Sequence, residues 1–152
     1  MMEQRITMVT LGVADLGRAG AFYEALGWRK AEESQPGITF YQCPGMLLGL
    51  FPLEELAEDQ GRPGETLGFG AMNLAQNQPD RATVDRVFQQ ALDAGATALK
   101  APEAVFWGGY SGYFADPDGH PWEVAHNPFA PLDKDGTLTL PSEQPNQPEQ
   151  SA

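Results

Sequence analysis

The two halves of this chain predict the same order of elements, and this repeat restricts the fold more than any other feature. In the first half, residues 6–13 predict a strand and residues 16–26 a helix. In the second half, residues 69–77 predict a strand and residues 79–95 a helix. Short strands are expected after each helix, at 28–32, 38–43 and 46–51, and again at 96–102, 110–115 and 122–126. The order βαβββ therefore occurs twice, and it predicts an α+β fold.

The two predicted helices resemble each other in sequence as well as in position. AFYEAL in the first corresponds to VFQQAL in the second. Asp15 is a candidate N-cap of the first helix, and Gly27 and Gly95 are placed where the two helices should end. Each helix can bury one face of a small sheet, so two such sheets that face each other would enclose a cavity.

The length of 152 residues suits one domain with a real core. We predict a single domain over 1–141, made of module one (about 5–53), a linker (about 54–66), module two (about 67–127) and a C-terminal arm (128–141). Residues 142–152 are rich in Pro, Gln and Glu, and we expect them to be disordered.

The charge of the chain excludes several partners. The formal net charge is -12 and the pI about 4.3, so the surface repels phosphate backbones and no nucleic-acid partner is expected. No apolar run approaches the roughly 18 residues of a membrane span, so we expect no membrane partner. The start of the chain does not read as a secretory signal, and Cys43 is the single cysteine, so the cytoplasm is the predicted location.

Two stretches resemble the vicinal oxygen chelate superfamily, which includes glyoxalase I, bleomycin-resistance proteins and extradiol dioxygenases. They are VADLGRAGAFYEALGW near the start and YFADPDGHPWEV near the end. The resemblance covers about 6–127 and implies paired βαβββ modules, each a curved half-barrel sheet, around a cavity. WGGYSGYFADPDG also looks like a subgroup of uncharacterised glyoxalase-like proteins.

Metal enzymes of this superfamily typically use His or Glu ligands at four positions. Carried over to this chain, those positions hold Met8, Gly49, Ala71 and Glu123. A divalent ion prefers several N or O donors, and only Glu123 supplies one. The resemblance therefore implies a degenerate metal site, and no cofactor is expected.

The stretch around Glu123 does not offer a replacement site. His120, Glu123 and His126 are spaced by three, so on a strand the two histidines would lie opposite Glu123 and roughly 20 Å apart. Pro121 and the preceding DPDG argue against a helix. The simpler interpretation of DPDG is a hairpin turn in which Asp116 bonds its own loop.

The same hairpin predicts which side chains line the cavity. If Glu123 points inward, Trp122 and Val124 pack beneath the helices, and Tyr113 lies near Glu123 across the hairpin. Trp107 precedes Gly108-Gly109 and can lie close to a ligand. The predicted ligand-binding residues are Trp107, Tyr110, Tyr113, Asn73, Phe69, Phe51 and Met8.

Glu123 has two interpretations. It can hydrogen-bond a neighbouring tyrosine or amide, or it can act as a catalytic general base, since burial in an apolar pocket raises the pKa of a carboxylic acid. The first functional hypothesis is a metal-free, bleomycin-resistance-like protein that binds a small, largely apolar, neutral or cationic molecule. The alternative is a lyase, isomerase or dioxygenase that uses Glu123 or an unusual metal site. A structural or regulatory dimer is a third, and a homodimer is expected from the resemblance.

Overall fold

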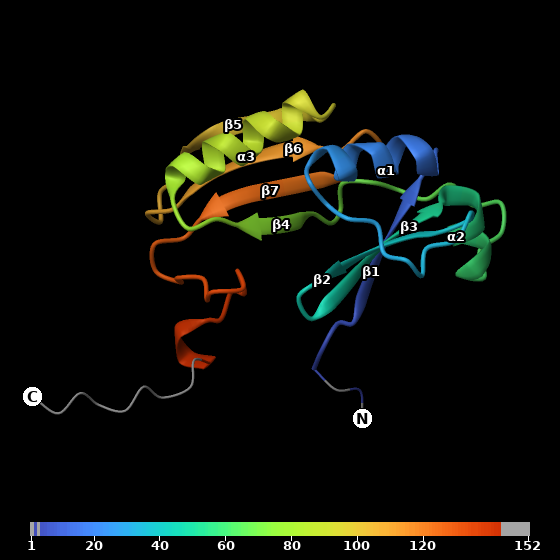
Figure 1. The fold of residues 1–152 in the computed structure, drawn as a ribbon, viewed down its shortest axis with the longest axis horizontal. Coiled ribbons are helices and arrows are strands. Elements are labelled where there is room, and N and C mark those ends of the chain that lie inside the picture. Colours follow the sequence, from blue (N-terminus) through green and yellow to red (C-terminus); the bar gives the residue numbers. More distant parts are fainter. Residues whose placement is uncertain (1, 3, 144–152) are drawn as a thin grey trace, which may run out of the picture.

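The computed structural model describes residue 2 and residues 4–143. This part of the chain forms two unclosed sheets with three α-helices (Figure 1). The elements of module one are β1 (Met8–Val13), α1 (Leu16–Ala25), β2 (Thr39–Cys43), β3 (Met46–Pro52) and α2 (Leu53–Asp59). Those of module two are β4 (Leu74–Asn77), α3 (Arg81–Asp93), β5 (Thr97–Ala104), β6 (Tyr110–Ala115) and β7 (Pro121–His126). A 3-10 helix (Pro141–Glu143) ends the described part.

The second sheet has the strand order β4-β7-β6-β5, in which β4 is parallel to β7 and the other pairs are antiparallel. With α3 between β4 and β5, this module is the predicted βαβββ unit. The first sheet has the order β1-β3-β2, with β1 parallel to β3. The α+β fold of two related modules is confirmed.

The strand predicted at 28–32 does not form. In this stretch only Lys30 bridges to Tyr41. The adjacent amide of Phe40 donates to the hydroxyl of Ser34 at 2.9 Å, so a side chain takes the place of a ladder partner. The first sheet therefore has three strands where four were expected.

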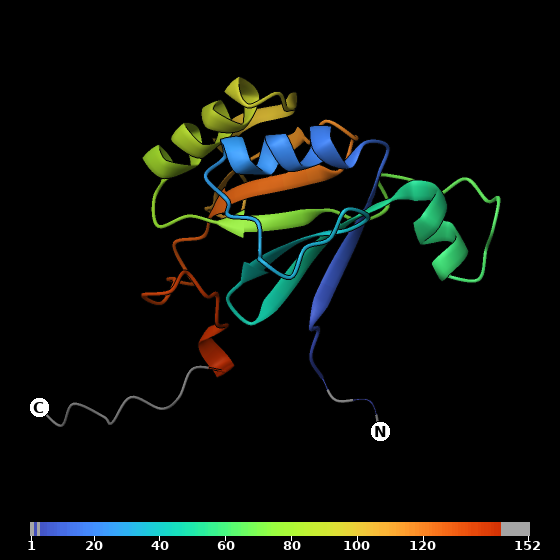
Figure 2. The ribbon, with the colours of Figure 1, turned by 45° about the vertical axis from the view of Figure 1, so that its right-hand side comes forward.

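The strand predicted at 69–77 is shorter than expected, because β4 begins only at Leu74. Gly70 has a φ of 89°, which is incompatible with an extended strand. Residues 60–73 therefore form a long connecting segment. In Figure 2 this segment, drawn in green, runs from the end of α2 to the start of β4. Phe69, Ala71 and Asn73 lie on this segment, outside the sheet.

Both long helices begin at an aspartate. The Asp15 side chain accepts from the Arg18 amide at 2.8 Å and caps α1, as predicted. Asp80 caps α3 in the same way through the Thr83 amide at 2.7 Å. Figures 1 and 2 show α1 and α3 side by side over the sheets, and the C-terminal arm on the opposite side. One face of the second sheet is therefore covered by α3, and no α-helix of the described residues covers the opposite face, which we call the open face.

The two modules share one core, in which Tyr23 of α1 is the central contact. Its side chain is fully buried, its hydroxyl donates to Asp116 at 2.7 Å, and it accepts from the indole N–H of Trp122 at 3.1 Å. Arg18 pairs with Asp118 at 2.9 Å beside it. Through these contacts α1 of module one binds the β6–β7 turn and the start of β7 in module two.

Within residues 2 and 4–143, no helix is both long and apolar enough to cross a membrane. The tail predicted to be disordered falls mostly on residues 144–152, which lie outside the described residues.

Candidate functional site

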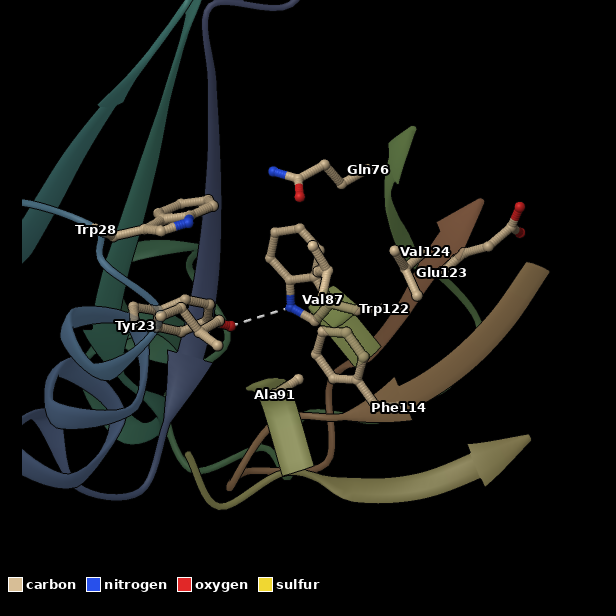
Figure 3. A pocket seen from close by; sticks show the side chains of 10 residues that line it. Tyr23, Trp28, Gln76, Val87, Ala91, Phe114, Trp122, Glu123 and Val124 are labelled. Atoms are coloured by element: carbon tan, nitrogen blue, oxygen red, sulfur yellow. Dashed lines mark hydrogen bonds between the residues drawn. The ribbon is translucent and has the colours of Figure 1, made fainter. Parts of the chain in front are cut away.

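Glu123 and Tyr113 form a polar pair on the open face of the second sheet. Trp122 and Val124 are buried on the face toward α3, and the half-buried Glu123 between them points the other way. Figure 3 shows the carboxylate of Glu123 directed away from Trp122 and Tyr23. Tyr113 lies directly opposite on β6, and its hydroxyl donates to Glu123 Oε2. The predicted cross-hairpin pairing of these two residues is confirmed.

The hydrogen bond to Glu123 is the main reason that the pKa of Tyr113 is raised, with desolvation a smaller contribution. The phenol therefore stays protonated at neutral pH and remains a donor to the carboxylate. A carboxylate that accepts one bond from a tyrosine still has lone pairs for a ligand donor. The pair can accordingly bind an ammonium group, or an N–H or O–H donor.

Apart from Glu123, the positions carried over from the superfamily's metal site hold side chains without N or O donors. On the neighbouring strand β4, Ala75 lies opposite Glu123. On the other sheet, Met8 begins β1 and Gly49 pairs with Thr10. Gly49 has room for a side chain, since an added Cβ would lie 3.4 Å from Thr10 Oγ1, yet it offers no donor. In the described part of the chain, no group of three or more His, Cys, Asp or Glu side chains has an arrangement that could hold a metal ion.

Neither histidine joins Glu123, because each bonds a main-chain carbonyl. His120 Nε2 lies 2.6 Å from Gly12 O, and His126 Nδ1 lies 3.0 Å from Gln78 O. Asp116 accepts from the amides of Asp118 and His120, both at 2.9 Å. The prediction that DPDG is a turn held by its own aspartate is confirmed.

The aromatic residues predicted to bind a ligand lie in different places. Trp107 is at the tip of the β5–β6 hairpin and is 42% exposed, with its ring against Gly109, where an added Cβ would lie 2.0 Å from the ring. Tyr110 lies on the face toward α3, and its hydroxyl donates to Asp85 at 2.6 Å. Neither position is the cavity lining that the sequence predicted. Side chains alternate along a strand, so Tyr110 and Tyr113 lie on different faces of the sheet. The tight turn places the Trp107 ring against Gly109 of the same turn.

The remaining predicted residues are also spread out. Phe51 is half-buried near the end of β3, and Met8 is 44% exposed at the start of β1. Asn73 is exposed just before β4, and Phe69 is 42% exposed on the segment 60–73. Of the seven, only Tyr113 contacts Glu123 by hydrogen bond.

Two hollows differ greatly in size. The first lies between the modules beside Tyr23, Trp28 and Trp122 (Figure 3), and its volume of about 30 Å³ is close to the share of one water molecule in the liquid. The second has a volume of about 230 Å³ and lies between β1, α2 and the segment 60–73. The sequence analysis did not predict that α2 lines this second hollow. Leu53 and Leu56, which are about one helical turn apart, are the sequence signal that could have indicated an inward helix face.

Comparison with known proteins agrees with this architecture. A model of the Glyoxalase/Bleomycin resistance protein/Dioxygenase superfamily matches residues 5–124. A glyoxalase-related enzyme from Fulvimarina pelagi is 37% identical, with a TM-score of 0.84 over 91% of this chain and 99% of that one. A lactoylglutathione lyase from Agrobacterium tumefaciens is 24% identical, with a TM-score of 0.64 over 83% of this chain and 96% of that one.

A curated relative matches only part of the chain. An uncharacterised protein of Mycobacterium bovis is 51% identical over 41 residues, which are 27% of this chain and 27% of that protein.

Proposed function

Because the chain belongs to the Glyoxalase/Bleomycin resistance protein/Dioxygenase superfamily, we propose that it binds a small organic molecule on the open face of the sheet β4-β7-β6-β5. The observation that carries this proposal is the pairing of Tyr113 with Glu123 on that face. A half-buried carboxylate with a fixed tyrosine donor provides an oriented acceptor. Such a group gives a ligand both its position and its charge preference.

The ligand class follows from the charges. Glu123 accepts hydrogen bonds and attracts cations, and the net charge of -12 repels anions over the whole surface. Across the fold, the alternate residues of β1 and β3 that face away from α1 include Met8, Leu47 and Phe51, which are apolar. We therefore expect a largely apolar ligand that is neutral or cationic.

Three probes of the same shape test this preference. Cyclohexylammonium should bind more tightly than cyclohexanol, and cyclohexanecarboxylate should bind most weakly, in calorimetric titrations at neutral pH. Glu123→Gln should weaken cyclohexylammonium about three- to tenfold, because it removes a partly exposed charge-assisted hydrogen bond, and leave cyclohexanol nearly unchanged. Equal binding of all three probes by the wild type would contradict the proposal.

We also propose that the protein works without a bound transition metal, since Glu123 alone remains of the superfamily's ligand set. Elemental analysis of purified protein should find far less than one zinc, nickel or iron per chain, and EDTA should leave the melting temperature unchanged. About one metal ion per chain, lost in Glu123→Gln, would contradict this.

A second candidate function is catalysis. It is favoured by the 37% identity to a protein described as a glyoxalase-related enzyme, together with the carboxylate on the open face. In that case Glu123 would act as a general base, with Tyr113 hydrogen-bonded to it. Incubation with a metabolite extract separates the two functions by mass spectrometry. A binding protein returns its ligand with unchanged mass and chromatographic retention, whereas an enzyme produces a new species that Glu123→Gln abolishes, and an isomerised product differs from its substrate in retention alone.

A further inference from the structure

The larger hollow, of about 230 Å³, includes neither Tyr113 nor Glu123, and of the four positions carried over from the superfamily's metal site it includes Ala71 alone. It lies where α2 crosses the end of β1, beneath the segment 60–73. A cavity of roughly 150 Å³ lined by apolar side chains is enough to bind benzene in another protein, so this hollow has room for a substituted benzene ring. The side chains that line the hollow determine which substituents on such a ring are favoured.

The aliphatic part of the lining comes from α2, which can approach β1 closely because residue 12 is a glycine. An added Cβ at Gly12 would lie 2.6 Å from Leu53 Cδ2 and 3.1 Å from Leu56 Cδ2. The glycine thus allows both leucines to pack against the strand while they also line the hollow. This part of the lining is apolar and offers nothing to a charged ligand.

Another part of the lining is aromatic. The Phe69 and His120 rings lie 4.7 Å apart between centroids, tilted by 48°, and both line the hollow. Met72 follows on the same segment and is 57% exposed. Aromatic rings and a thioether prefer a flat aromatic partner to an aliphatic one of the same volume.

His120 also provides one polar contact of known type. Its Nε2 bonds Gly12 O at 2.6 Å, and a carbonyl oxygen only accepts, so Nε2 carries the proton. In the neutral ring Nδ1 is then the acceptor that is left for a ligand donor. The lining also includes the charged side chain of Arg62, which is half exposed and pairs with Gln60 and with Glu65 at 3.5 Å.

We propose that this hollow is a second small-molecule site, which binds a neutral aromatic molecule that bears one hydrogen-bond donor, of the phenol class. The ring packs between the leucines of α2 and the Phe69–His120 pair, and its hydroxyl donates to His120 Nδ1. The segment 60–73 covers the ligand. The site does not depend on whether Glu123 binds a cation.

The test uses p-cresol as the probe and p-xylene as its isosteric control without a donor. In methyl NMR spectra of the full chain, p-cresol should shift the methyl signals of Leu53, Leu56 and Met72 in a saturable manner. We expect p-cresol to bind about fivefold more tightly than p-xylene, the usual net gain of one hydrogen bond. Shifts that map instead to the C-terminal arm, or no shifts at all, would overturn the site, and equal affinities would overturn the role of His120.

Matched variants locate the site independently. Leu56→Phe fills the hollow and should weaken p-cresol at least tenfold, whereas Leu99→Phe makes the same change on the exposed strand β5 and should leave p-cresol binding as in the wild type. Glu123→Gln should also leave p-cresol binding unchanged, so failure of this site and failure of the proposed function are distinguishable. Full p-cresol affinity in a folded Leu56→Phe variant would refute the proposal.

Discussion

At the scale of single residues, the stability of this protein depends on buried polar groups whose partners come from the other module. Tyr23 is the main example, since its hydroxyl bonds Asp116 and Trp122, which lie 93 and 99 positions away. Tyr41 is equally buried but makes a single bond, to Gly20 O at 3.3 Å. The two tyrosines therefore form a matched pair for experiments on the core.

Tyr23→Phe should lower the free energy of unfolding by about 2–4 kcal/mol, because it leaves a buried carboxylate oxygen and a buried indole N–H without that partner. Tyr41→Phe removes only one longer bond and should cost less than about 1.5 kcal/mol. Urea denaturation of both variants measures the difference. Similar losses in the two variants would show that Tyr23 does not hold the modules together through these bonds.

The same residues predict how stability changes in alkali. Burial raises the pKa of Tyr41 from 10.0 to about 12, and burial also raises that of Tyr23. Between about pH 10 and 12 these tyrosines lose their hydroxyl protons in the unfolded state but keep them in the folded state. The unfolded state therefore binds fewer protons. The free energy of unfolding should therefore fall as pH rises through this window, by about 1.4 kcal/mol per pH unit for each tyrosine.

Urea denaturation from about pH 9 to about pH 11 checks this direction. The Tyr41→Phe variant should show a shallower fall than the wild type, since one of the shifted groups is gone. An identical slope in the variant would mean that Tyr41 does not contribute.

At the scale of elements, short-range rules explain the helices well and some of the strands poorly. The caps and the glycines that follow α1 and α3 act within one helical turn, and Gly27 and Gly95 have φ values of 94° and 114°. The strand expected at 28–32 was lost because Ser34 bonds the Phe40 amide instead. A helix end is decided locally, whereas a strand requires a partner.

The N-cap of α1 gives a test at this scale. Asp15→Ala should lower the free energy of unfolding by about 1 kcal/mol, because the Arg18 amide loses its acceptor. Asp15→Asn should cost much less, since the amide oxygen can still cap the helix. Thermal melts of both variants distinguish capping from a loss of charge, because a charge effect would make Asn as costly as Ala.

At the scale of the whole molecule, each sheet keeps one open face and several apolar side chains remain exposed. Phe106, at the tip of the β5–β6 hairpin, is fully exposed, and Phe129 of the C-terminal arm is 66% exposed and lies beside Gly108. Every residue of β5 except Pro102 is also exposed, so one edge of the second sheet is uncovered. We propose that a second copy of the chain covers part of this surface.

Light scattering at micromolar concentration should accordingly give about twice the chain mass of 16.5 kDa. Because each chain carries a net charge of -12, added salt should screen the repulsion and strengthen the dimer. A mass of one chain throughout the micromolar range, at both low and high salt, would exclude the dimer.

The sequence by itself determined the two modules, the helix caps and the register that places Tyr113 against Glu123. These features follow from the periods of helix and strand and from a short turn, so a few neighbouring residues specify them. Only the tertiary structure decided that Tyr110 bonds α3, that Trp107 lies on its own turn and that Phe69 meets His120 beside a hollow. Those contacts depend on the path of long connections and on packing between segments far apart in the chain, and no local pattern encodes either.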